Sequence, residues 1–148
     1  MQDTNQQPDV PVIYLKPTRF DFVLEGVAVL LLLALWAVVL GSFVFPDWYP
    51  ERFDQSGGMV VAIMMTFSVV IICRRVRLLE PMESTLVTIT EENAERQCRL
   101  FTRLWQYLLI VMLLMFLEIS LRGFLPGRYV GISACLFLWY IIRSRMLK

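Results

Sequence analysis

The sequence predicts an all-α, four-helix polytopic membrane protein, with two transmembrane hairpins joined by a cytoplasmic bridge. Of the 148 residues, 57% are hydrophobic, which exceeds the roughly 45–50% apolar content of soluble domains. The apolar residues form runs near membrane-spanning length, whereas residues 74–103 hold six of the fourteen basic residues and cannot lie in lipid. We expect residues 1–17 to be a flexible tail and residues 18–148 to be a single membrane domain.

The first helix is expected over residues 20–45. Residues 26–45 carry no charge, and twenty residues at about 1.5 Å each cross the roughly 30 Å hydrocarbon core of a bilayer. Thr18 is the expected N-cap. Asp21 and Glu25 lie in the first turns, where the helix dipole favours negative charge.

The second and third helices are expected over residues 56–78 and 90–121. Gly57 permits a sharp turn before the second helix. Thr90 is the expected cap of the third helix, which should begin in water before it enters the membrane. Two pairs in its first turns have the i,i+4 spacing that stabilises exposed helices: Glu92–Arg96 and Glu95–Arg99.

The fourth helix is expected over residues 124–145. Its uncharged run, residues 129–142, is only fourteen residues long. We therefore expect it to use Phe124 and Leu125 as well, with the Arg128 side chain reaching back to the lipid headgroups.

The basic residues predict the orientation of these helices. Eleven of the fourteen would be cytoplasmic if both termini are cytoplasmic, and the other three are Arg52, Arg122 and Arg128. Cytoplasmic flanks of membrane helices are usually enriched in Lys and Arg. The sequence therefore predicts a multi-pass protein of the cytoplasmic (inner) membrane with both ends of the chain inside.

Composition argues against several classes of function. The absence of His removes the commonest metal ligand and the usual acid–base residue near neutral pH. Cys73, Cys98 and Cys135 are widely spaced and form no metal-binding pattern. A net charge of +1 gives no overall field for nucleic acid. We expect a non-enzymatic protein without metal or cofactor, with the bilayer and either a membrane protein or a second copy as partners.

Two segments outside the apolar runs are candidate sites. The three arginines at the start of the third helix recur at intervals of three and four, so we expect them to line one face. That face is either a site for anionic headgroups or an acidic partner, or a solvated flank. The candidates on this cytoplasmic helix are Thr90, Glu91, Glu92, Asn93, Arg96, Arg99 and Arg103, and those in the outer loop are Pro50, Arg52, Phe53, Asp54 and Gly57.

Glu118 is the one acidic residue at membrane level. A carboxylate there is costly in hydrocarbon and is therefore a functional candidate. Arg122 follows four residues later, in the order that helices favour. We interpret the two as an ion pair at the outer interface in preference to a proton relay.

Three segments resemble the bacterial membrane family called domain of unknown function 1648. Residues 49–57 (YPERFDQSG) resemble its Pro-x-His-Phe-Asn-x-x-Gly signature, with Arg52 in place of His and Asp54 in place of Asn. Residues 89–104 (ITEENAERQCRLFTRL) resemble a downstream stretch of its small members. The start of the first helix is also similar, at Thr18, Asp21, Leu24, Glu25 and Gly26.

The resemblance implies a modest functional expectation. The family is largely uncharacterised, and its loop domain also occurs in an immunity protein that protects bacilli from a sporulation-delaying peptide toxin. We expect an inner-membrane protein of toxin immunity or envelope sensing that acts through residues 50–57 outside and residues 90–103 inside. The alternative is a small oligomeric transporter or channel subunit with Glu118 facing a polar lumen. An enzyme that uses the outer-loop carboxylates has the least support.

Overall fold

The computed structural model describes residues 15–49, 55–75, 91–122 and 127–146. Every regular element among these residues is helical, which confirms the all-α, four-helix prediction. The elements are α1 (Arg19–Val44), the short 3-10 helix η1 (Pro46–Trp48), α2 (Gln55–Arg75), α3 (Glu91–Arg122) and α4 (Arg128–Met146).

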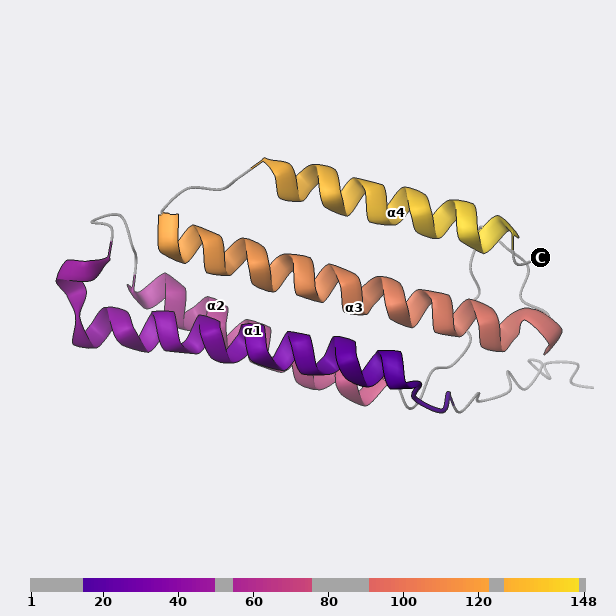
Figure 1. Ribbon diagram of the computed structural model, residues 1–148, viewed down its shortest axis with the longest axis horizontal. Coiled ribbons are helices and arrows are strands. Elements are labelled where there is room, and N and C mark those ends of the chain that lie inside the picture. Colours follow the sequence, from indigo (N-terminus) through magenta and orange to yellow (C-terminus); the bar gives the residue numbers. More distant parts are fainter. Residues whose placement is uncertain (1–14, 50–54, 76–90, 123–126, 147–148) are drawn as a thin grey trace, which may run out of the picture.

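The helices form an up-down-up-down bundle. Figure 1 shows that α1 and α3 begin at the end of the bundle where α2 and α4 finish, and that α3 lies between α1 and α4. α3 packs against each of the other three helices, whereas α4 packs on α3 alone among the described elements. We call the end where α1 and α3 begin the basic end, because Lys16, Arg19, Arg74 and Arg145 lie there.

Three helices are long and apolar enough to cross a membrane: α1 (Arg19–Val44), α2 over Gln55–Arg74 and α3 over Asn93–Arg122. Many of their exposed side chains are large and hydrophobic, and Leu30 of α1 is 67% exposed. α4 is not among these helices, and three of its 19 residues are arginines. Three membrane-compatible helices support the membrane prediction, while a fourth pass stays a prediction.

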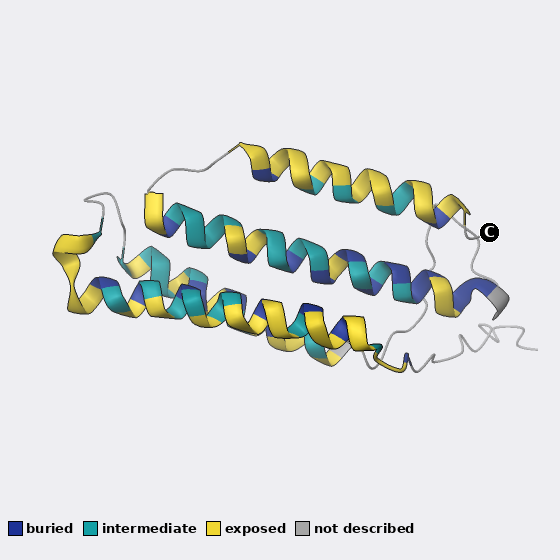
Figure 2. Cartoon of the chain, viewed as in Figure 1, coloured by how far each residue is buried: buried dark blue, intermediate teal, exposed yellow. Residues whose placement is uncertain are grey.

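The apolar core lies where α1, α2 and α3 meet. Leu35 and Val39 of α1, Ala62 of α2 and Leu113 of α3 are completely buried. Figure 2 shows buried residues along the inner sides of the helices and exposed residues along the outer sides. Because lipid is as apolar as leucine, close packing and small residues such as Ala62 hold membrane helices together.

Two polar contacts join α1 to α2 within this bundle. Trp36 Nε1 donates a hydrogen bond of 3.0 Å to Thr66 Oγ1, which donates in turn to the carbonyl of Ala62. Gln55 Nε2 donates to the carbonyl of Ser42 at 2.8 Å. These bonds satisfy polar groups that would be costly to leave unpaired in lipid.

The helix boundaries differ from the predicted ones at two points. Gly57 lies inside the first turn of α2, which begins at Gln55, and not in a turn before the helix. α4 begins at Arg128, where the Val130 amide donates to the carbonyl of Gly127, so it is shorter than the predicted helix. Residues 1–14, 76–78, Thr90, Phe124 and Leu125 lie outside the described residues, and the expectations for them are untested.

Candidate functional site at the basic end

A capping box begins α1. The Thr18 amide and hydroxyl each donate a hydrogen bond of 2.7 Å to Asp21 Oδ2, and the Asp21 amide donates to Thr18 Oγ1 at 3.3 Å. This reciprocal arrangement satisfies backbone donors that a helix start leaves without partners. The predicted cap by Thr18 is confirmed. The Asp21 side chain completes the capping box, because it accepts a hydrogen bond from the Thr18 amide.

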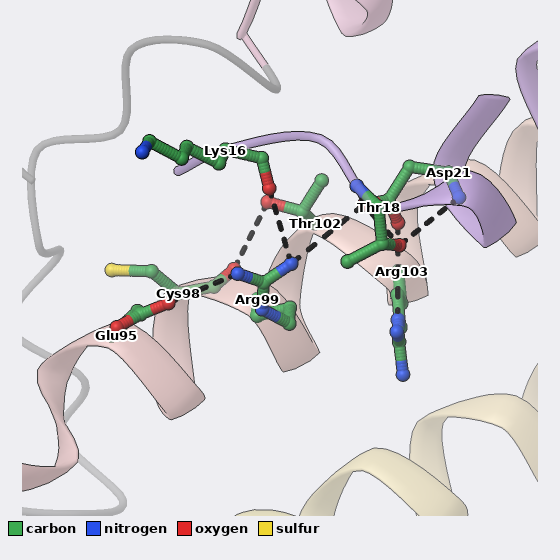
Figure 3. Close-up of polar contacts among 8 residues, drawn as sticks. All are labelled: Lys16, Thr18, Asp21, Glu95, Cys98, Arg99, Thr102 and Arg103. Atoms are coloured by element: carbon green, nitrogen blue, oxygen red, sulfur yellow. Dashed lines mark hydrogen bonds and ion pairs between the residues drawn. The ribbon is translucent and has the colours of Figure 1, made fainter. Parts of the chain in front are cut away.

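The Asp21 carboxylate is also the meeting point of α1 and α3. Its side chain is only 4% exposed, and two guanidinium groups approach it from α3 (Figure 3). Arg99 Nη1 lies 3.8 Å from Oδ2, and Arg103 Nε lies 3.9 Å from Oδ1. These distances exceed those of hydrogen bonds, so the contacts are charge pairs that compensate a buried negative charge.

The two arginines have different partners. Arg99 Nη2 donates to Glu95 Oε1 at 3.0 Å, and Arg99 Nη1 donates to the carbonyl of Lys16 at 3.4 Å. The predicted Glu95–Arg99 pair is thus confirmed. Arg103 instead lies over the ring of Phe20, 5.4 Å from its centre, and its buried Nε has no hydrogen-bond partner among the described residues. Both terminal nitrogens of Arg99 therefore donate hydrogen bonds, whereas those of Arg103 donate none within the described residues.

The other residues predicted on the cytoplasmic helix lie in several environments. Arg96 is exposed, whereas Arg99 and Arg103 are half-buried against α1, so the three arginines do not form one solvated face. Asn93 is buried in the first turns of α3. Glu91 and Glu92 belong to α3, but the structure leaves their side chains undescribed, and Thr90 lies outside the described residues.

A pair of buried polar residues joins α3 to α4 near the same end. Gln97 Nε2 donates to the carbonyl of Ser144 at 2.9 Å, and the Ser144 hydroxyl donates back to Gln97 Oε1 at 3.0 Å. Both residues are nearly inaccessible to solvent. This contact could not be predicted from the sequence, because nothing in the local pattern around Gln97 or Ser144 selects the other as its partner.

Gln106 is a second buried glutamine of α3, and it was not predicted as a site residue. It is 3% exposed, and neither its Oε1 nor its Nε2 has a hydrogen-bond partner in the described part of the chain. Residues three apart are neighbours on a helix surface, so Gln106 follows Arg103 on one face. Its position inside an apolar run is the sequence feature that could have identified Gln106 as a candidate site residue.

At the opposite end of the bundle, Glu118 links α3 to α4. Arg122 Nε lies 3.2 Å from Glu118 Oε1, which confirms the predicted ion pair. Two residues of α4 also contact this carboxylate: Arg128 pairs with it, and the Tyr129 hydroxyl donates a hydrogen bond of 2.7 Å. The carboxylate is 11% exposed, and its contacts with Arg128 and Tyr129 connect the two helices.

The outer-loop candidates are mostly outside the described residues. Pro50, Arg52, Phe53 and Asp54 are not described, and Gly57 lies in the first turn of α2. The described residues contain no group of three or more Cys, Asp or Glu placed to hold a metal ion.

No family model, curated protein or solved structure matches this chain. Membership of the domain of unknown function 1648 family accordingly stays a prediction. Two segments that carry the resemblance meet at the basic end: the start of α1, with Thr18 and Asp21, and the first turns of α3, with Arg99 and Arg103.

Proposed function

We propose that this chain is a four-pass, non-enzymatic protein of the bacterial inner membrane that serves in toxin immunity or envelope sensing. The observation that carries the proposal is the arrangement of charge on the bundle. Apolar side chains cover the outer faces of α1, α2 and α3. The basic end gathers most of the described cations, as the positive-inside rule expects of a cytoplasmic face.

The length and flanks of α4 support a fourth pass. Its 19 residues span about 28 Å at about 1.5 Å per residue, close to the roughly 30 Å hydrocarbon core. Arg128 and Arg143 lie near its two ends, where long side chains reach the headgroups. The helix runs antiparallel to α3, so its last residues return to the basic end.

Reporter fusions test this topology directly. A cytoplasm-active reporter after Lys148 should be active, and a periplasm-active reporter after Trp48 should be active as well. Because α4 alone separates the outer end of α3 from the C-terminus, a periplasmic signal after Lys148 would show that α4 does not cross. A cytoplasmic signal after Trp48 would refute the orientation.

Two arguments support the role in immunity or sensing: the resemblance to the family, and the contacts that the polar groups at the basic end make between α1 and α3. Asp21 contacts Thr18 at the start of its own helix and Arg99 of α3, and a contact between helices is the behaviour of a residue that holds a bundle together. In this proposal residues 50–57 meet a peptide outside the membrane. The first turns of α3 transmit the change inside, through their contact with α1.

A deletion strain tests the role. Cells without the protein should become sensitive to at least one membrane-active peptide in a broad panel, and expression of the full chain should restore resistance. A variant with Arg52, Phe53 and Asp54 changed to alanine should fail to restore it, although the protein reaches the membrane in normal amount. Unchanged survival of the deletion strain across the panel would refute the immunity role.

The alternative role, a transporter or channel subunit, has less support. It needs Glu118 to face a polar lumen, whereas this carboxylate contacts Arg122, Arg128 and Tyr129. Flux through proteoliposomes that falls in a Glu118→Gln variant would nevertheless favour it over the immunity role. Equal flux in empty and protein-containing vesicles would remove it.

A further inference from the structure

We propose that Arg103 binds the phosphate group of an anionic phospholipid at the junction of α1 and α3. The phosphate would lie against the guanidinium group, and the lipid chains would follow the exposed ring of Phe20 toward the membrane interior. This inference requires the bundle to lie in a bilayer, but it does not depend on a role in immunity or sensing.

The first step concerns the hydrogen-bond donors of Arg103. An arginine has five N–H donors arranged in a planar fork that matches phosphate oxygens. The Arg103 Nε atom is buried and faces the Asp21 carboxylate at 3.9 Å, so it cannot meet a ligand. The side chain is nevertheless 33% exposed, and its Nη1 and Nη2 groups make no hydrogen bond within the described residues, so these are the donors that a phosphate would meet.

The second step is that Asp21 places Arg103 without occupying its donors. The Oδ2 atom of Asp21 already accepts two hydrogen bonds from Thr18. Asp21 Oδ1 lies 3.9 Å from Arg103 Nε, so the carboxylate compensates part of the arginine charge without a hydrogen bond and leaves the Nη1 and Nη2 groups for a ligand. Arg99 is a natural contrast, because Glu95 and the carbonyl of Lys16 already accept its hydrogen bonds.

The third step is the position of Arg103 along α3. It is the last charged residue before the apolar run that leads to Glu118, so it lies at the boundary between headgroups and hydrocarbon. Its side chain is 33% exposed and thus reachable from outside the bundle. Anionic headgroups of the cytoplasmic leaflet attract basic residues placed at this level.

Phe20 distinguishes a lipid from free phosphate as the occupant. Its ring is 45% exposed in the first turn of α1, and the Arg103 guanidinium lies over it. A lipid uses both features, because its phosphate meets the cation and its glycerol and chains meet the ring. Free phosphate would use only the cation.

Native mass spectrometry of the full chain, purified in detergent and titrated with single phospholipids, tests the proposal. We expect phosphatidylglycerol to bind at least tenfold more tightly than phosphatidylcholine. Arg103→Gln should reduce that preference to less than twofold. Arg96→Gln is the matched control: it removes the same charge from an exposed position of the same helix and should leave the preference within twofold of the original.

Further variants separate the site from general effects. Arg103→Lys retains the charge but not the planar fork, so we expect a lipid preference between those of the original chain and Arg103→Gln. If Arg103→Gln does not fold, the preference of Arg103→Lys is measured in its place. Phe20→Ala should weaken phosphatidylglycerol binding with the cation unchanged. Equal losses in Arg96→Gln and Arg103→Gln, or no preference in the original chain, would overturn the site. Displacement of the lipid by millimolar inorganic phosphate would overturn the lipid assignment.

Discussion

Asp21 of the first helix and Arg103 of the third lie 3.9 Å apart, between carboxylate Oδ1 and guanidinium Nε. The carboxylate is buried, and it also lies near Arg99 and caps its own helix through Thr18. The Asp21 side chain thus stabilises the start of its own helix and also forms ion pairs with α3. The contact links the start of α1 to α3, and separating the helices here would leave the buried charge of Asp21 uncompensated, which is costly.

Replacing Asp21 with asparagine should weaken the bundle. Asparagine caps helices well, so Asp21→Asn removes mainly the charge that Arg99 and Arg103 face. Because both arginines are partly exposed, we expect a loss of about 1–3 kcal/mol in unfolding free energy. Denaturant titration in detergent would measure it. Asp47→Asn, at an exposed position in η1, is the control, and an equal loss there would contradict the role of Asp21.

The two buried glutamines of α3 should respond in opposite ways to leucine. Gln106→Leu removes two polar atoms without partners and should stabilise the protein by about 1–2 kcal/mol. Gln97→Leu leaves the buried Ser144 hydroxyl without its acceptor and should cost about 1–3 kcal/mol. Thermal unfolding of both variants in one detergent would decide. A destabilised Gln106→Leu would show that Gln106 has a hydrogen-bonding role.

Glu118 and Tyr129 should be energetically coupled. Their hydrogen bond joins α3 to α4, so Glu118→Gln and Tyr129→Phe should not have additive effects. Neighbouring residues in one polar network typically show coupling of about 0.5–3 kcal/mol. A double-mutant cycle on unfolding free energy would measure it. A coupling energy that does not differ from zero within the experimental error would mean that this hydrogen bond does not stabilise the packing of α4 on α3.

The hydrogen bond from Trp36 to Thr66 should contribute little to the unfolding free energy, although it lies between two helices of the bundle. Thr66→Val keeps the shape of the side chain but removes the acceptor for the indole N–H. Hydrogen bonds between membrane helices average about 0.6 kcal/mol, so we expect a loss of that size. Trp36→Phe should cost more, since it removes packing as well. A Thr66→Val loss above about 2 kcal/mol would contradict this estimate.

Local features of this fold were predictable from the sequence. Uncharged runs located the first three helices, and spacing of four residues located the Glu95–Arg99 and Glu118–Arg122 pairs. These features depend only on residues within a few turns of one helix.

Contacts between helices were not predictable in the same way. The approach of Asp21 to Arg103 and the bond between Gln97 and Ser144 depend on how each helix is rotated and which helices are neighbours. α1 has almost no polar side after its first turns, so its pattern could not indicate the face that meets α3. In lipid an apolar face on the outside is as favourable as one on the inside.

Among the described elements α4 packs on α3 alone, and this has a consequence for biosynthesis. During translation α1, α2 and α3 emerge first, and their shared core needs no residue of α4 to close. The last helix then joins an already assembled trio, guided by Ser144 at one tip and Tyr129 at the other. A chain that ends at Arg122 and has left the ribosome should therefore still fold into a three-helix unit.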